Sequence, residues 1–408
     1  MAVDTNPLNK NILEDLLRPK LDADSIQIES IAVRRLTKQG DNYGSTMLAV
    51  DVSLKSGTRT LHLVAKMLPK SIILQEFFQC SVTVRKEIDL YLFVRPEYER
   101  IQKENNLPDD KYLDVFPLCY GARASWKGDS APVDEGAVIL LENLKEQGYI
   151  CADRFSGLDL THCELVVDKL ARFHATAIAI KIKKPEEFKA TILKATNFVA
   201  VCLPYDIVLK RLEEIHEYQT MKEKINTALM KGREVFKNNY LRSPREPFAT
   251  FTHLDLWTNN IMFQYEPDST KRIPKNVKFV DFQLTGYDSP ARDLLFFLYT
   301  SANMEVLSGH YEYLVRFYYD RFLDCLKILD CDTTPFAFDE FLKELEYSSI
   351  VEFWHLAIMI KVVTRSEEEA FSTDNMTYED LRIKCNYPRA YTRRFGKLAL
   401  DFASRNWI

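Results

Sequence analysis

The residues with the clearest capacity for chemistry lie in one short run and in the strand-like segment that follows it. His253, Asp255 and Asn260 have the spacing H-x-D-x-x-x-x-N, and an apolar stretch ending at Val280 leads to Asp281. An aspartate, an asparagine five positions on and a second aspartate after a strand are the groups that phosphoryl transfer from Mg-ATP requires. We therefore predict a catalytic pair, with Asp255 as the base and His253 bracing its loop. The oxygen atoms of Asn260 and Asp281 would bind Mg²⁺.

The surroundings of this motif matter, because a lone D-x-x-x-x-N is usually a chance match. Strand-like segments at 248–252 and 261–264 lead into and out of the motif, and 277–282 reads as the strand that carries Asp281. This context indicates a kinase, a hypothesis that depends on the motif lying between strands.

A second group of residues is suited to binding the phosphates of ATP. Lys66 ends the third predicted strand in the sequence Val-Ala-Lys, where its ammonium would contact the α- and β-phosphates and a helix glutamate would hold it in place. Glu76 and Glu87 both compete for that role, and Glu87 is favoured. The phosphate-covering segment is expected at 39–45. It contains Gly40 and Gly44 but no G-x-G-x-x-G, so an ordinary turn is an equal alternative.

The adenine side of the site is expected at 140–144, a Leu-Leu-Glu-Asn-Leu segment. Backbone groups near Glu142, Asn143 and Leu144 would meet the edge of the base. Side-chain identity says little at such a position, because the contacts would be made by the main chain.

A helix after the second aspartate is expected to support the catalytic loop. Asp288 or Ser289 would cap this helix, with Pro290 in its first turn. Asp293 would tie the helix to the loop that carries Asp255.

The elements that position these residues fall into two parts. Strands are predicted at 26–36, 46–54, 58–68 and 138–141, and apolar residues from Phe77 to Tyr91 recur at helical spacing. Thr161 to Glu164 fits a capping box, which would open the next helix. Further helices are predicted at 9–18, 205–238, 290–303, 309–329, 337–365 and 388–405. The fold class is therefore α+β with two lobes, a small β-rich lobe at 1–141 and a large, mostly helical lobe at 142–408. The cleft between them would take the nucleotide.

Composition excludes several other classes of protein. The 408 residues carry a formal net charge of −5 without a basic block, which argues against nucleic acid as a partner. The longest apolar runs are far shorter than the roughly 20 residues of a membrane helix, and the N-terminal segment lacks a secretory signal. The eight cysteines are scattered without metal-ligand spacing, so we expect reduced thiols in a cytoplasmic protein.

Four segments together resemble the ecdysteroid kinase-like family of insects, which is related to choline and aminoglycoside kinases. They are HLDLWTNNIMF, VDFQLTGYDSPARDLLFFL, VILLENL and LARFHA. The resemblance implies a protein-kinase-like bilobal fold and ATP- and Mg²⁺-dependent phosphorylation of a hydroxyl group. The acceptor would be an ecdysteroid or a similar apolar or xenobiotic alcohol. Residue by residue, the resemblance supports Asp255 as base, Asn260 and Asp281 as metal ligands, and Lys66 as the phosphate lysine. The expected partner is a small-molecule alcohol, and the expected state is a monomer.

Two positions qualify this interpretation. The family has H-G-D where this chain has His253-Leu254-Asp255, and leucine adopts a positive φ only at a cost, so activity would fall if the glycine is needed for backbone shape. Gln283 stands where protein kinases have glycine but agrees with the family, and it suggests a metal loop that does not swing. A choline- or sugar-type kinase and a catalytically silent ligand-binding relative remain the alternatives.

Overall fold

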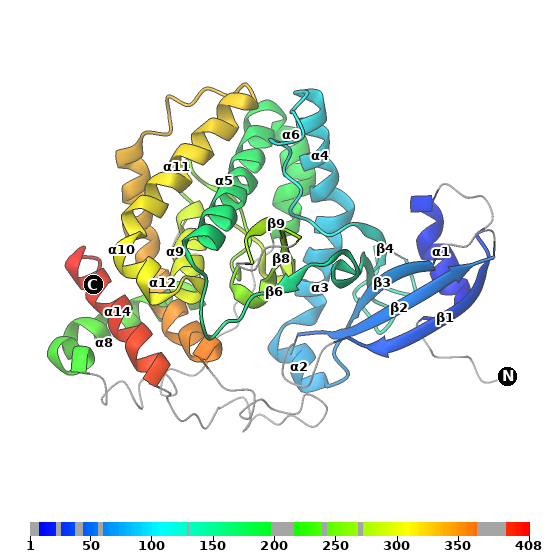
Figure 1. Ribbon diagram of the computed structural model, residues 1–408, viewed down its shortest axis with the longest axis horizontal. Coiled ribbons are helices and arrows are strands. Elements are labelled where there is room, and N and C mark those ends of the chain that lie inside the picture. Colours follow the sequence, from blue (N-terminus) through cyan, green and yellow to red (C-terminus); the bar gives the residue numbers. More distant parts are fainter. Residues whose placement is uncertain are drawn as a thin grey trace.

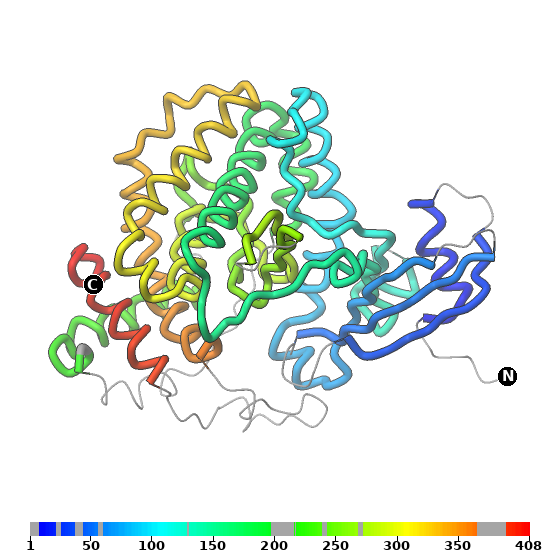
Figure 2. Tube along the Cα trace, viewed as in Figure 1, coloured from blue at the N-terminus to red at the C-terminus, as the bar shows by residue number. Residues whose placement is uncertain are grey.

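The chain folds into an antiparallel sheet at one end and a large group of helices at the other (Figure 1). The first described residues lie on the sheet side and the C-terminus on the helical side, as the trace in Figure 2 shows. The structure, a computed structural model, describes residues 8–21, 26–36, 44–55, 60–128, 130–196, 216–238, 243–267, 272–364 and 389–408. Gly40 and most of the expected phosphate-covering segment lie outside these residues.

The sheet has five antiparallel strands in the order β1-β2-β3-β5-β4. They are β1 (Ile28–Arg35), β2 (Thr46–Leu54), β3 (Thr60–Met67), β4 (Cys119–Arg123) and β5 (Val138–Glu142). Side chains alternate between its two faces. Leu61, Leu63 and Ala65 of β3 share a small core with helix α1 (Lys10–Leu21), whereas Val64 belongs to the large core of the protein. The sheet is therefore covered on both faces.

Between the third and fourth strands the chain forms a broken helical segment. It comprises α2 (Ile72–Phe77), α3 (Cys80–Asp89), a π-helical turn (Leu90–Val94) and α4 (Arg95–Glu104). The sequence predicted one continuous helical pattern from Phe77 onward, which is wrong at Gln79. This residue has a φ of 48° and separates α2 from α3. The break lets α3 take its own direction, and α3 carries Glu87.

The helical part is built around α9, in which every residue is buried. Its helices are α5 (Leu160–Lys183), α6 (Pro185–Glu187), α8 (His216–Lys237), α9 (Pro290–Ser301), α10 (Met304–Gly309), α11 (Tyr311–Ile328), α12 (Phe338–Thr364) and α14 (Arg389–Ser404). Ser289 caps α9 through its side chain, as one of the two expected caps. The predicted capping box of α5 is wrong. The helix begins at Leu160, and Asp159 accepts the hydrogen bond from the His162 N–H at 3.0 Å, because an aspartate at that position satisfies a free amide.

Two small sheets flank the segment with the catalytic motif. One pairs β7 (Thr250–Thr252) with β10 (Gly286–Asp288), and the other joins β6 (Ile150–Cys151), β8 (Ile261–Tyr265) and β9 (Pro274–Phe279). The strand expected to run through 282 ends at Phe279, because Asp281 takes a left-handed conformation with φ 66°. The α+β class, with a β-rich and a mostly helical part, is thus confirmed, and the boundary at 141 stays a prediction. Within the described ranges, no helix combines the length and apolarity needed to span a bilayer.

Candidate active site

The H-x-D-x-x-x-x-N motif closes into a loop held by its own ends. Strand β7 stops at Thr252, and a 3₁₀ turn (Thr258–Asn260) ends the loop. The Asn260 Nδ2 donates to the backbone oxygen of Asp255 at 2.8 Å and to its carboxylate Oδ2 at 3.0 Å. The five-residue spacing therefore fixes the orientation of the Asp255 carboxylate. Both bonds use the amide nitrogen of Asn260 and not its Oδ1, the atom that would bind a cation.

His253 links this loop to the segment that carries Asp281. The imidazole is fully buried, and its Nε2 donates to the Val280 oxygen at 3.2 Å while its Nδ1 accepts from the Asp255 N–H at 3.3 Å. Burial lowers the pKa of His253, so the ring is neutral and its two nitrogens keep these donor and acceptor roles. The ring also packs on Phe282, with centroids 4.7 Å apart. His253 thus braces the loop, as its place in the motif suggested.

Asp293 on α9 holds the backbone of the loop from below. Its Oδ2 accepts from the His253 N–H at 2.6 Å and its Oδ1 from the Leu254 N–H at 2.7 Å. Its Oδ2 also lies 3.0 Å from His174 Nε2, and His174 Nδ1 lies 2.7 Å from the hydroxyl of Tyr318. The sequence indicated the tie from Asp293 to the loop but not the contact with His174. Its position in LARFHA was the one available signal.

Leu254 adopts the positive φ that leucine was expected to resist. Its φ is 61°, and its N–H is held by Asp293. The side chain lies over Gly286, where a methyl group would come within 2.7 Å of the leucine Cδ1. The loop therefore keeps the backbone shape that a glycine would give, because a neighbouring glycine leaves space for the leucine.

Two acidic side chains from separate parts of the chain meet at Lys66. Its Nζ lies 2.6 Å from Glu87 Oε2 and 2.7 Å from Asp281 Oδ1. Of the two candidate glutamates, Glu87 on α3 makes this ion pair, while Glu76 belongs to α2. Burial by itself would lower the pKa of Lys66, but Asp281 and Glu87 raise it by more than that. The pKa therefore lies above its ordinary value, and the lysine stays charged.

The electrostatic environment of Asp255 is unusual for a carboxyl group. Burial raises its pKa well above the ordinary value, and the negative charge of Asp281 raises it further, while Asn260 and Lys66 act in the opposite direction. A carboxylate with a raised pKa is a stronger base than a solvated aspartate. The same environment shows that Asp255, Asp281 and Lys66 lie within electrostatic reach of one another.

The segments that carry Asn260 and Asp281 are joined through their backbones. The Val280 N–H donates to the Asn260 oxygen at 3.0 Å, which joins the two segments one residue before Asp281. Oxygen donors of this kind suit Mg²⁺, which takes one or two protein carboxylates and receives other ligands from phosphates and water. Over the described part of the chain, no group of three or more His, Cys, Asp or Glu side chains forms a metal cage.

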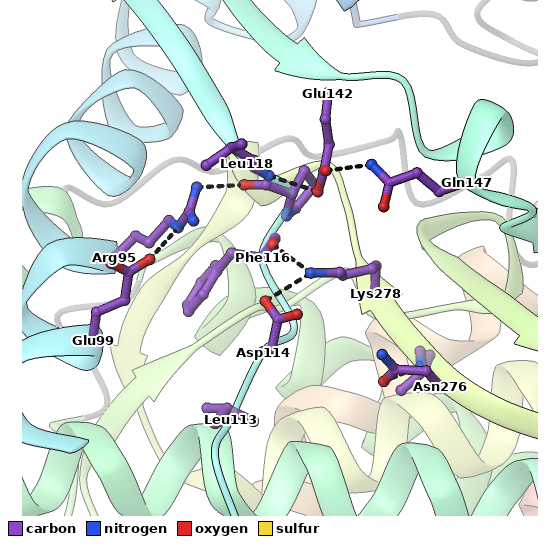
Figure 3. A network of polar contacts seen from close by, with 12 residues as sticks. Arg95, Glu99, Leu113, Asp114, Phe116, Leu118, Glu142, Gln147, Asn276 and Lys278 are labelled. Carbon is purple, nitrogen blue, oxygen red and sulfur yellow. Dashed lines mark hydrogen bonds and ion pairs between the residues drawn. The ribbon is translucent and has the colours of Figure 1, made fainter. Parts of the chain in front are cut away.

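The expected adenine segment 140–144 begins within β5, which pairs with the strand that carries Lys66. The Glu142 side chain is turned into the protein, where it accepts from the Leu118 N–H at 2.8 Å and from Gln147 Nε2 at 2.5 Å (Figure 3). Asn143 donates its N–H to the His62 oxygen at 3.0 Å and caps the 3₁₀ turn that begins at Leu144. These hydrogen bonds attach the segment to β3 and to the residues that precede β4.

A polar network behind this segment was not foreseen from the sequence. The Lys278 Nζ donates to Asp114 Oδ1 at 2.7 Å and to the Phe116 oxygen at 3.1 Å, and Arg95 donates to the Pro117 oxygen at 2.9 Å (Figure 3). The Lys278 bonds attach the connection between α4 and β4 to strand β9, and the Arg95 bond attaches it to α4. No motif marks these residues, because their partners are mostly backbone oxygens.

The fold and this site together define a kinase-like protein. A strand lysine pairs with a helix glutamate, and an aspartate–asparagine loop lies beside a second aspartate. The chain belongs to the ecdysteroid kinase-like family, whose model matches residues 39–331.

Comparison with known proteins adds two findings. No curated protein matches the sequence. Fifteen chains of solved structures match the fold, among them spectinomycin phosphotransferase APH(9)-Ia in complex with ADP and spectinomycin. That chain is 11% identical with a TM-score of 0.44, and the match covers 98% of this chain and 100% of the other.

Proposed function

We propose that the protein transfers the terminal phosphoryl group of ATP to a hydroxyl group of a small-molecule alcohol. The observation that supports this most directly is the meeting of Lys66, Asp281 and the Asp255–Asn260 pair in one site. Membership of the ecdysteroid kinase-like family supports the same class of reaction. An ecdysteroid or another apolar or xenobiotic alcohol is the proposed acceptor, and ATP with Mg²⁺ the proposed cofactors.

Each residue of the site has a defined task in this reaction. Asp255 accepts the proton of the attacking hydroxyl, with its carboxylate oriented by Asn260 and its loop held by His253 and Asp293. Lys66 supplies a permanent positive charge for the phosphates, since Glu87 keeps it in place. Asn260 and Asp281 would hold Mg²⁺, which supplies neutralisation of the charge that develops on the phosphates. Orientation and electrostatics account for most of the catalysis in such a site.

The test is ATP turnover by the full chain against a panel of steroid and phenolic alcohols, with choline and sugars included. Asp255→Asn removes the base but keeps the shape of the side chain, so we expect a loss of roughly 10²–10⁴-fold. Asp320→Asn, the same change at an exposed aspartate on α11, is the matched control and should leave the rate unchanged. Equal phosphorylation of every acceptor by wild type and Asp255→Asn would rule out the proposal.

The pH profile of the same reaction gives a second measure. Because burial and Asp281 raise the pKa of Asp255, protonation should remove the base at a pH above that of a solvated aspartate. The acid limb of kcat/KM should therefore lie above about pH 4, the value of an unperturbed aspartate. A limb at or below that value would contradict the assignment of Asp255 as the base.

A further inference from the structure

Gln283 has a buried side-chain donor without a hydrogen-bond partner in the described part of the chain. It lies two residues after Asp281, in the 3₁₀ turn Phe282–Leu284, and the residue is 7% exposed. Its Nε2 is buried and has no hydrogen-bond partner among the residues that the structure describes. Buried amide groups in proteins are nearly always paired, and an unpaired one costs about 1–3 kcal/mol. A group that destabilises the free protein in this way calls for a partner that binds later.

The side chain of Gln283 reaches from the metal loop to the first strands of the sheet. A methyl group on Gly44 would come within 2.9 Å of the Gln283 Oε1, so residue 44 must be small for the amide to lie there. Gly44 lies two residues before the start of β2, and its oxygen accepts a contact from Cys80 Sγ on α3 at 3.8 Å. The carboxamide therefore lies where the sheet, α3 and the Asp281 segment meet.

The segments that meet at Gln283 also carry the proposed phosphate lysine and a proposed metal ligand. Lys66 is charged, and its strand pairs with β2, where Met47 lies opposite Lys66. Asp281, two residues before Gln283, shares its negative charge with that lysine. An amide N–H at this junction is suited to an oxygen of a phosphate group, because an ionised acceptor makes the stronger hydrogen bond.

We infer that Gln283 is a nucleotide-binding residue whose Nε2 donates a hydrogen bond to a phosphate oxygen of ATP or ADP. The inference rests on the proposed function and adds one residue to its site. If Gln283 had only a structural role, replacing it would change the affinity for every ligand of the site to the same extent. If Gln283 donates a hydrogen bond to a phosphate oxygen, replacing it would lower the affinity only for ligands that carry phosphate.

The experiment measures binding of ADP, with Mg²⁺ present, and of adenosine to the full chain by calorimetry. Gln283→Met keeps the length of the side chain and removes the N–H donors. We expect ADP to bind about tenfold or more weakly, equivalent to about 1.4 kcal/mol, and adenosine to bind as before. The ligand-free protein should keep or raise its Tm, because the unpaired amide is gone. Gln264→Met is the matched control, since Gln264 on β8 donates to the Gln147 oxygen at 2.9 Å.

A second variant displaces the amide without removing it. Gly44→Ala should push the Gln283 side chain away and lower the affinity for ADP relative to adenosine. Equal losses for both ligands, or normal ADP binding by Gln283→Met, would overturn the inference while leaving the proposed function intact. Wild-type protein that binds neither ADP nor ATP would overturn both.

Discussion

Leu254, directly beside the proposed base, has a strained backbone conformation and a side chain packed against Gly286. Its φ of 61° costs about 1–2 kcal/mol for an L-residue with a Cβ. The N–H bond to Asp293 holds this conformation, and the side chain fills the space above Gly286. The leucine and the glycine are thus one unit, and neither can be judged from its own position in the sequence.

This dependence can be tested with two glycine substitutions. Gly286→Ala brings a methyl group against the leucine Cδ1 and should lower the free energy of unfolding by about 1–3 kcal/mol, measured by urea denaturation. In a Leu254→Gly background the same change should cost much less. Gly309→Ala, with no atom within 4 Å of the added group, is the control. An equal cost of Gly286→Ala in both backgrounds would contradict the pairing.

At the scale of elements, α9 supports the catalytic loop as a platform, because its Asp293 binds the loop backbone. Asp293 in its first turn accepts both backbone N–H groups of the loop, and His174 on α5 and Tyr318 on α11 extend the network. Burial raises the pKa of Asp293, but the hydrogen bond and charge of His174 outweigh it, so the pKa lies below the ordinary value. One carboxylate therefore joins three helices to the loop.

Asp293→Asn should destabilise the protein by roughly 3–5 kcal/mol, because a donor NH₂ then faces a donor N–H in a buried site. Tyr318→Phe, which removes only the outer hydrogen bond, should cost about 1 kcal/mol.

A group with a lowered folded pKa contributes stability above its unfolded pKa and loses it as pH falls through the folded pKa. The difference in the free energy of unfolding between wild type and Asp293→Asn should therefore become smaller at acid pH. Urea unfolding at several pH values measures this, and equal costs for the two variants would refute the platform role.

At the scale of the whole molecule, Lys66 connects the sheet with both α3 and the segment after β9. Its two ion pairs join residues from β3, from the broken helical segment and from the helical part of the fold. The pKa of Glu87 is raised, mainly by burial, even with the lysine beside it. The stability of the sheet against the rest of the protein thus depends on a charge that also serves the proposed reaction.

Lys66→Met leaves two acidic side chains without their cation and should cost roughly 3–5 kcal/mol near neutral pH. The pKa of Glu87 would rise further, so stability should return as pH falls and the carboxyl takes up a proton. Adding Glu87→Gln should restore most of the stability at neutral pH while nucleotide binding stays weak. Lys278→Met is the control, because its partner Asp114 is 60% exposed and can be hydrated. Thermal unfolding from pH 5 to 8 tests this, and a pH-independent loss would count against it.

The sequence by itself determined several local features of this protein. The alternation of β3, the helical spacing of α11 and α12 and the Asp–Asn spacing of the catalytic loop each depend on residues a few positions apart, so periodicity and motif were sufficient. The α+β class followed from the order of these patterns.

Only the tertiary structure decided which distant residues meet. Lys66 and Asp281 are 215 positions apart, and the choice of Glu87 over Glu76 depends on the break at Gln79. The catalytic loop can hold a leucine at position 254 because Gly286 leaves space for its side chain. The contact of Gln283 with Gly44 depends on how the sheet lies against the helical part. Such contacts arise from packing between elements, which no local pattern of residues encodes.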